Sequence, residues 1–333
     1  MKTKLVYVMV SNEKDIYLER TLLSVFSARL YMPDVEIVLL VDELTDKSLQ
    51  GKRRKLLDYI TSKIVVNIDE KYNKKQRSRI LKTSLREHVT GDFLFIDSDT
   101  LITSSLADAD GFDFDIGAAP DTCLENNPVL IFRIKSGFDI VKLPVNEIFP
   151  YYNSGVIYAK DNPATKQFFS DWHQCLRQCY SKGIYVDQLA FKMANIKNHS
   201  MIHELPCHWN CQMRDGLKYI NDAKIIHFFT NNYTNDLFSK FQNKKFYLTI
   251  RENGDIDEQT AWLIKNWRSD FANSTYIICN EEVDLWRSYS VRLLHNLQRK
   301  CRNLYNCIEF FSKLFYQTAV YLKYRILGIS YLD

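Results

Sequence analysis

Short apolar runs alternate with stretches of helical periodicity through the first hundred residues of the chain. Each run has the length and composition of a strand that is buried on both faces of a sheet. Between the runs, apolar residues recur every three or four positions, which is typical of a helix with one buried face. This alternation predicts an α/β fold with a mostly parallel sheet. The predicted strands are 5–10, 35–41, 64–68 and 93–96, and the predicted helices are 15–30, 45–60 and 73–88.

The second half of the chain alternates less regularly. The further predicted strands are 115–119, 155–159 and 223–228, and the further predicted helices are 164–181 and 186–193. From about Asn280 the sequence becomes helical, basic and aromatic. These changes predict three parts. The parts are an α/β domain over residues 1–240, a connecting segment over 241–280 and a helical C-terminal extension over 281–333.

The composition is that of a globular protein and limits its partners. The 333 residues are 46% apolar, which is enough for a large core. The formal net charge is only +4, and the basic residues are not joined to a recognised nucleic-acid-binding motif. No nucleic-acid partner is therefore expected.

Eight cysteines occur in the sequence, and no export signal precedes them. The apolar run at 5–10 is too short to be such a signal. The cysteines are therefore expected to be reduced thiols in a cytoplasmic protein. The pairs Cys175/Cys179 and Cys207/Cys211 share one spacing, but it is not a standard zinc pattern. Ordinary half-buried cysteines are preferred over a structural zinc site.

Two carboxylates separated by one residue follow the predicted strand at 93–96. In open α/β sheets, ligands gather at the carboxyl ends of strands, which is where Asp97 and Asp99 lie. Both carboxylates can face one hard cation, which prefers oxygen ligands and keeps positions open for phosphate. A cation there would neutralise the charge that grows on a departing diphosphate. By itself, the Asp97-Ser98-Asp99 tripeptide also suits a solvated turn.

Other short motifs stand before and after this tripeptide. They are Ser78-Arg79-Ile80-Leu81-Lys82, Phe93 to Ile102, Ala118 to Asp121, Tyr152-Asn153-Ser154-Gly155-Val156, Asp187-Gln188 and Ile225-Ile226-His227. In this order and spacing, over roughly residues 4–230, the chain resembles the nucleotide-diphospho-sugar transferases. The closest likeness is to glycosyltransferase family 8, which holds glycogenin and bacterial lipopolysaccharide galactosyl- and glucosyltransferases. The resemblance implies a Rossmann-like GT-A fold for residues 1–240.

The resemblance also implies an activity and a cofactor. The activity is transfer of a hexose from a nucleotide-diphosphate sugar, with a UDP-sugar favoured, to a saccharide or lipid-linked acceptor. In this family, paired aspartates and a late histidine hold Mn²⁺. The matching ligands here are Asp97, Asp99 and His227, for Mn²⁺ or Mg²⁺. Two carboxylates and a neutral imidazole suit such an ion. The alternative for His227 is a strand-end histidine with a structural hydrogen bond.

Further residues are implied for the donor and for the reacting carbon. The implied donor-binding residues are Val10, Ser11, Arg79, Lys82, Asp97 and Ser98. The implied catalytic residues are Asn153, Asp187 and Gln188, in an enzyme that retains the anomeric configuration. The alternative for Arg79 and Lys82 is a solvated basic face of a helix. The alternative for Asp187 is an ordinary surface helix over 186–193. The chain also lacks the Gly and Lys-Pro-Trp run that follows the histidine in the family, so its diphosphate contacts must come from elsewhere.

Two other functions stay open at this point. An apolar strand before Asp-x-Asp-x-Thr is also the nucleophile motif of haloacid-dehalogenase-like phosphatases, in which Asp97 would be the nucleophile. Those enzymes usually carry the motif on their first strand, whereas three strands precede it here. They also need a late acidic pair, for which Asp255 and Asp257 are the candidates. The other alternative is an inactive sugar-binding protein of the same fold.

The C-terminal extension is basic and aromatic. Residues 283–333 contain eight Lys or Arg against three Asp or Glu. Charges such as Glu309 and Lys313 interrupt any apolar stretch that could span a bilayer. A basic helix with an aromatic face can instead lie in the membrane interface. This predicts peripheral association with the inner face of the cell membrane, as in bacterial surface-polysaccharide assembly. The alternative is that these helices pack onto the catalytic domain or against a second copy.

Overall fold

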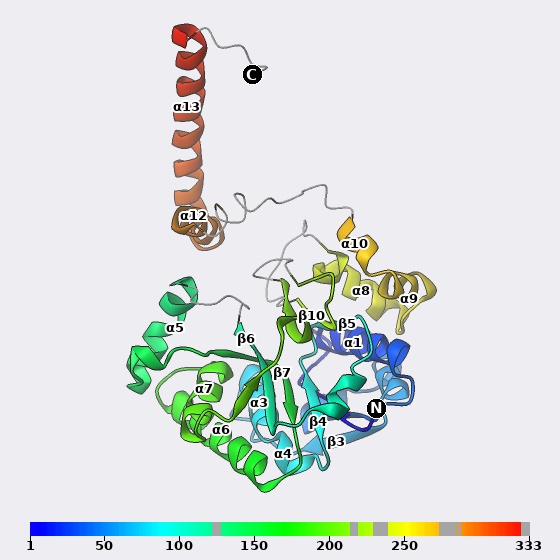
Figure 1. The fold of residues 1–333 in the computed structure, drawn as a ribbon. Coiled ribbons are helices and arrows are strands. Elements are labelled where there is room, and N and C mark those ends of the chain that lie inside the picture. The colour runs from blue at the N-terminus through cyan, green and yellow to red at the C-terminus, as the bar shows by residue number, and fades with distance from the viewer. Residues whose placement is uncertain (122–127, 214–218, 229–238, 273–284, 286–287, 328–333) are drawn as a thin grey trace. The chain divides into compact units, whose positions relative to one another are not determined.

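Figure 1 draws the chain as a computed structural model. The structure describes residues 1–121, 128–213, 219–228, 239–272, 285 and 288–327. The chain divides into two units, Met1–Asn273 and Ser274–Asp333.

A seven-stranded sheet forms the centre of the first unit (Figure 1). Its strands are β1 (Lys4–Met9), β2 (Ile37–Asp42), β3 (Ser62–Val66), β4 (Phe93–Ile96), β6 (Ile116–Pro120), β7 (Tyr152–Ala159) and β8 (Ile202–Glu204). Their order is β3-β2-β1-β4-β7-β6-β8. The first four strands of this order run parallel, as predicted. Because β7 runs antiparallel to both β4 and β6, the sheet as a whole is mixed.

Helices cover both faces of this sheet, which confirms the predicted α/β class. The helices of the first unit are α1 (Tyr17–Tyr31), α2 (Glu43–Ser48), α3 (Lys74–Thr83), α4 (Leu85–His88), α5 (Pro128–Val141), α6 (Pro163–Ser181), α7 (Asp187–Lys197), α8 (Lys244–Asn253), α9 (Glu258–Lys265) and α10 (Arg268–Ala272). Side chains of β1 alternate between two cores because successive strand residues face opposite ways. Tyr7 packs in the core beneath α1, and Val6 packs in the core beneath α3, α4, α6 and α7.

Two predicted helices are interrupted in the structure. The helix predicted at 45–60 is α2 followed by a 3₁₀ helix, η1 (Gly51–Tyr59). Gly51, at a φ of 53°, lies between the two pieces in the left-handed region that glycine adopts easily. The helix predicted at 73–88 is α3 followed by α4, with a break at Ser84.

The first unit extends further along the chain than residue 240. The predicted connecting segment, residues 241–280, contains three helices that the sequence pattern did not predict, α8 to α10. Tyr247, Ile250 and Trp267 from this segment are buried in the same core as α1. The Arg251 guanidinium also binds the Glu19 carboxylate of α1 at 2.7 and 2.9 Å. Residues 244–272 are therefore part of the folded body of the first unit.

A second, three-stranded sheet brings distant parts of the chain together. It consists of β5 (Thr100–Ile102), β10 (Ile225–His227) and β9 (Cys211–Gln212), in the order β5-β10-β9. β10 runs antiparallel to β5, with His227 opposite Thr100. This register places His227 next to the turn between β4 and β5.

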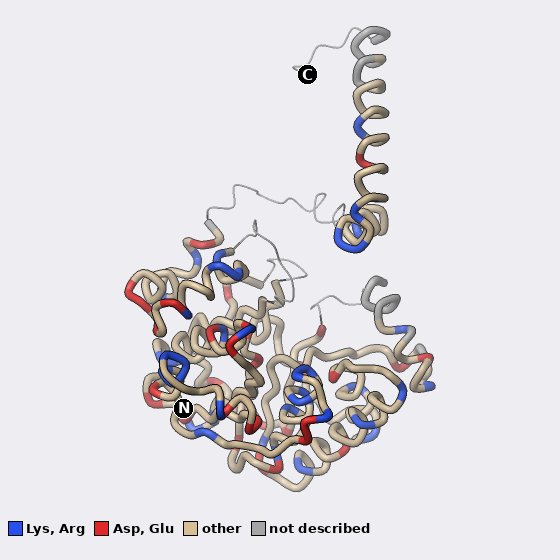
Figure 2. Tube along the Cα trace, turned by 180° about the vertical axis from the view of Figure 1, so that it is seen from behind, with Lys and Arg blue, Asp and Glu red and all other residues tan. Residues whose placement is uncertain are grey.

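The described part of the second unit is helical, as predicted. Its helices are α12 (Tyr289–Lys300) and α13 (Arg302–Leu327). Figure 2 marks the basic residues of α12 and the more widely spaced charges of α13. Within the described residues, no helix is long and apolar enough to cross a membrane.

Candidate active site

Asp97 and Asp99 lie in the turn between β4 and β5. The backbone N–H of Asp97 donates to the Gly155 carbonyl of β7 at 2.8 Å. The Thr100 hydroxyl donates to the Asp97 carbonyl at 2.9 Å. These bonds hold the backbone of the tripeptide, and both carboxylates line one cleft.

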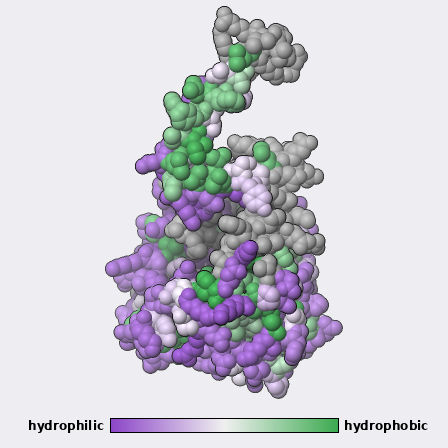
Figure 3. Space-filling view, turned by 90° about the vertical axis from the view of Figure 1, so that its left-hand side faces the viewer, coloured by the Kyte–Doolittle hydropathy of each residue, from purple (hydrophilic) through white to green (hydrophobic). Residues whose placement is uncertain are grey.

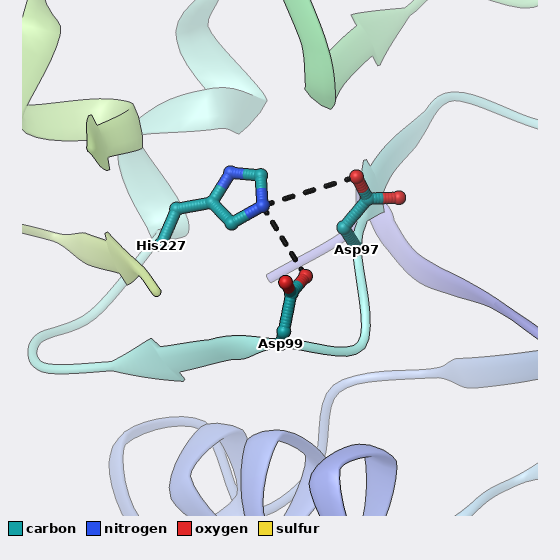
Figure 4. A group of neighbouring side chains, drawn as sticks. All are labelled: Asp97, Asp99 and His227. Atoms are coloured by element: carbon teal, nitrogen blue, oxygen red, sulfur yellow. Dashed lines mark ion pairs between the residues drawn. The ribbon is translucent and has the colours of Figure 1, made fainter. Parts of the chain in front are cut away.

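His227 completes a compact group with the two carboxylates (Figure 4). Its Nε2 lies 3.2 Å from Asp99 Oδ1 and 4.0 Å from Asp97 Oδ2. The N–H of Phe228 donates to the Asp99 carbonyl at 2.9 Å, which continues the pairing of β10 with β5. His227 is almost fully buried, at 2% exposure, so its ring is held by the protein.

A directional chain of hydrogen bonds fixes which nitrogen of the ring faces the carboxylates. The Asp121 carboxylate accepts from Asn153 Nδ2 at 3.1 Å, so Asn153 turns its Oδ1 the other way. That oxygen accepts from the Gly155 N–H and from Asn210 Nδ2, both at 2.9 Å. Asn210 therefore presents its Oδ1 to His227 Nδ1 at 3.0 Å. Nδ1 must carry the proton of this bond, which leaves Nε2 for the carboxylates.

The group fits a divalent metal ion. Because Nδ1 is the protonated nitrogen, Nε2 can lie this close to a carboxylate only if a second proton or a cation lies between them. One ligand atom from each of Asp97, Asp99 and His227 lies within 4.8 Å of the other two. Two carboxylate oxygens and one imidazole nitrogen suit Mn²⁺ or Mg²⁺. Metal-binding histidines commonly donate their other ring N–H to an oxygen acceptor, and Asn210 Oδ1 is that acceptor here.

A cluster of alternating charges lies next to this group. Lys82 Nζ is 3.3 Å from Asp97 Oδ1 and 3.1 Å from Asp187 Oδ2. Asp187 Oδ1 accepts from Arg79 Nε at 3.0 Å, and its Oδ2 accepts from the Ser154 hydroxyl at 2.9 Å. The cluster joins α3, the turn after β4, β7 and the first residue of α7.

The charges of these groups depend on one another. Burial raises the pKa of Asp97, and Lys82 and His227 offset this only in part. Burial acts in the same direction on Asp99, but the hydrogen-bonded imidazole of His227 and the charge of Arg20 outweigh it and lower the pKa of Asp99 to about 2. Burial opposes the charge of Lys82, yet the carboxylates of Asp187 and Asp97 raise its pKa above the ordinary value. Asp187 is buried too, but Lys82 and Arg79 hold its pKa well below the usual range.

A cleft of about 1000 Å³ contains both groups. It is lined by Val10, Arg79, Lys82, Asp97, Ser98, Asp99, Asn153, Asp187, Gln188 and His227, which are all the predicted site residues except Ser11. Ser11 is buried beside the cleft. Its N–H donates to Thr45 Oγ1 at 3.0 Å, and its hydroxyl donates to Asp15 at 2.8 Å.

Other candidates from the sequence do not enter the cleft. Asp255 accepts from the Tyr59 hydroxyl at 2.7 Å, and Asp257 caps α9, so neither faces Asp97 as a phosphatase acid pair would. The group of metal-binding geometry within the described chain is Asp97, Asp99 and His227, not a cysteine cluster. The expectation of reduced thiols is wrong for Cys207, which is disulfide-bonded, and holds for Cys211, which is free.

Sequence reasoning missed Asn210 and gave no role to Gly155. Asn210 lies in a 3₁₀ helix, η5 (Cys207–Asn210), and nothing in its local sequence marks it as a partner of the late histidine. Gly155 stands in the Asn-Ser-Gly stretch, and a Cβ there would come within 2.3 Å of His227 Cε1. A glycine is therefore required for the ring to occupy its place.

No protein-family model and no curated protein matches the sequence. Several solved structures do match. Mouse xyloside xylosyltransferase 1 is 16% identical with a TM-score of 0.47, over 71% of this chain and 100% of that one. The galactosyltransferase LgtC, solved with donor and acceptor sugar analogs, is 15% identical with a TM-score of 0.47, over 86% and 99%. GlyE of Streptococcus pneumoniae is 15% identical with a TM-score of 0.44, over 80% and 64%.

Replacing Gly155 by alanine tests the placement of His227. The new methyl group would displace the ring, because the clash is with the ring itself and with Asn153. We expect Mn²⁺ affinity, measured by calorimetric titration, to fall by about tenfold or more, which is typical when the support of a metal-binding histidine is lost. Gly111→Ala is the control, since a Cβ there meets nothing within 4 Å. Equal Mn²⁺ affinity in the two variants would contradict this account of the site.

Proposed function

We propose that the protein is a metal-dependent glycosyltransferase. It moves a hexose from a nucleotide-diphosphate sugar to a saccharide or lipid-linked acceptor. The observation that supports this most strongly is the joint presence, in one cleft, of a carboxylate–carboxylate–imidazole group and the cations Arg79 and Lys82. This combination suits a substrate whose leaving group is a diphosphate, because such a group needs both a divalent ion and fixed positive charge.

The chemistry follows from the charges that line the cleft. The bond between the sugar C1 and the diphosphate oxygen breaks, and its electron pair stays with the diphosphate. The acceptor hydroxyl oxygen forms the new bond to C1, and its proton passes to the departing diphosphate, so no strong protein base is required. An ion held by Asp97, Asp99 and His227 would supply positive charge at the diphosphate, where Lys82 and Arg79 add to it.

Gln188 is the better candidate of its pair for the positive charge that develops at C1. The Asp187 carboxylate is already engaged by Lys82, Arg79 and Ser154. Gln188 Oε1 lies 3.4 Å from Asn153 Nδ2, at the edge of the hydrogen-bonded chain that reaches His227. We propose that Gln188 faces the sugar and that Asp187 positions the two cations.

Hydrolysis of a panel of nucleotide sugars, with and without Mn²⁺, tests the proposed function. We expect one donor class, with UDP-sugars favoured, to be cleaved only when the metal is present. Complete inactivity toward every donor would favour the inactive sugar-binding alternative, and phosphate-ester hydrolysis would favour the phosphatase. For an active donor, NMR of the transferred linkage tests the retaining outcome that the sequence resemblance implies.

We further propose that the second unit attaches the enzyme to an anionic membrane surface, at the inner face of the cytoplasmic membrane. The apolar residues of α12, such as Leu293 and Leu297, fall on the side of the helix opposite Arg292 and Arg299. On α13, apolar side chains lie exposed, with Phe311 at 60% and Phe315 at 78%. Figure 3 shows hydrophobic residues along the visible face of these helices. Such helices lie in the interface plane when basic residues meet anionic lipid.

Flotation with vesicles tests this attachment. We expect the protein to float with vesicles that contain anionic phosphatidylglycerol at low salt and to be released as salt rises, since each basic residue contributes about 1 kcal/mol. The double variant Phe311→Gln, Phe315→Gln should lose flotation while keeping donor hydrolysis. A protein that stays in the soluble fraction at low salt, and that sediments as a dimer through this unit, would support pairing with a second copy instead.

A further inference from the structure

One cation of the cleft has no partner among the residues that the structure describes. Four basic side chains on α3 line the cleft, namely Lys74, Lys75, Arg79 and Lys82. Lys74 binds Asp15, Arg79 binds Asp187, and Lys82 binds Asp97 and Asp187. Lys75 makes no hydrogen bond or ion pair with any residue that the structure describes.

Arg79 also presents an unsatisfied group. Its Nε is used by Asp187, but its Nη1 is buried without a hydrogen-bond partner among the described residues. A buried guanidinium nitrogen without an acceptor is costly, so an acceptor from a ligand is the natural completion. Lys75 lies four residues earlier, on the same face of α3, and the charge of Arg79 lowers its pKa. An anion between the two side chains would satisfy Nη1 and relieve their repulsion.

The charge balance of the cleft points to the anion. Asp97, Asp99 and Asp187 oppose Arg79 and Lys82, so a bound divalent ion brings these groups to one net positive charge. Lys75 raises the net charge to two, since Lys74 is neutralised by its ion pair with Asp15. The diphosphate of a nucleotide sugar carries about one negative charge on each of its two phosphates, so the complete cleft would match it.

The segment after His227 offers no alternative cation. The sequence has no Lys or Arg between Lys224 and Lys240. Lys224 itself binds Asp108 outside the cleft. Among the described residues, the Lys and Arg side chains that line the cleft all belong to α3.

We propose that Lys75 and the Nη1 group of Arg79 form a subsite that binds the diphosphate of the donor. This rests on the proposed function and adds to it a residue that the sequence analysis did not select. Lys75 is a binding residue for the leaving group, and α3 then supplies three cations to it, at positions 75, 79 and 82.

Binding of pyrophosphate in the presence of Mn²⁺, measured by calorimetry, tests the subsite. We expect Lys75→Met to weaken binding by about fivefold, a modest factor because Lys75 is partly exposed to solvent. Lys75→Arg should bind within about twofold of the wild type, since it keeps the charge. Lys71→Met is the matched control, because Lys71 lies outside the cleft in an exposed ion pair with Asp69. Thermal unfolding checks that all variants are folded.

Three results would overturn the subsite. They distinguish failure of the subsite alone, a role of Lys75 in acceptor binding, and failure of the proposed function. Equal pyrophosphate affinity for Lys75→Met and Lys71→Met would show that Lys75 does not bind the diphosphate. Unchanged pyrophosphate affinity together with a raised KM for the acceptor would assign Lys75 to an anionic acceptor instead. If the wild-type protein fails to bind pyrophosphate with Mn²⁺ at all, the proposed function fails together with the subsite.

Discussion

Replacing Asp99 by asparagine is expected to lower metal-dependent turnover of the nucleotide sugar by about a hundred- to a thousandfold. Asp99 Oδ1 is the carboxylate oxygen nearest to His227 Nε2, at 3.2 Å. An amide keeps the shape of the side chain but removes its charge, so a divalent ion loses one of two anionic ligands. Turnover at saturating donor, over a range of Mn²⁺ concentrations, measures the effect.

The fold should survive this change. Asp99 lines the cleft, and its backbone bond from Phe228 does not involve the side chain. Asp108→Asn is the control, since it makes the same change in charge at a carboxylate that is 71% exposed and paired with Lys224. Near-normal turnover in Asp99→Asn, or full activity of the wild type in EDTA, would rule out the metal site.

The sequence predicted the parallel half of the sheet well because the signal there is local. The strands β1, β2 and β4 are nearly continuous apolar runs, which a sheet covered on both faces accommodates. The signal is weaker for β3, an edge strand that begins with the exposed Ser62 and Lys63. The position of Asp97 at the end of such a run was enough to place it at the ligand-binding edge. The direction of β7 depends on pairing with β4 and β6, and strand pairing is not encoded in a single segment.

The candidate site was predictable as a set of residues but not as a geometry. His227 is 128 positions beyond Asp99, and the antiparallel register of β10 on β5 brings them together. Asn210 is the last residue of η5 and directly precedes β9. Because β9 pairs with β10, Asn210 comes within reach of His227. The hydrogen-bonded chain that sets the imidazole tautomer therefore exists only in the folded state.

The boundary near residue 240 was missed for a related reason. Helices α8 and α9 are short, and their buried positions, such as Tyr247 and Ile264, are separated by charged residues. Such segments resemble polar connections when they are viewed alone. Only their packing against α1 shows them to be part of the core.

Asp187→Asn is expected to destabilise the fold by about 3 kcal/mol at neutral pH, because it breaks a buried charge cluster and leaves cations behind. Lys82 would lose one of its two carboxylate partners and keep Asp97 and the Ser154 hydroxyl, and Arg79 would lose its carboxylate partner. Denaturant unfolding at pH 7 measures the loss. Asp108→Asn is again the control, because its exposed pair should contribute well under about 1 kcal/mol.

The pH dependence of this difference tests the cause. In the folded protein, Lys82 and Arg79 hold the pKa of Asp187 below its usual range, whereas in the unfolded chain it is about 3.9. A carboxyl whose pKa is lower in the folded state contributes stability above the unfolded pKa and loses it as the pH falls. The gap between wild type and Asp187→Asn should therefore be full above about pH 5 and shrink steadily below about pH 4. A gap that stays constant down to pH 2 would mean that the amide disturbs packing rather than charge, and Asp187 would then not be the residue that positions Lys82 and Arg79.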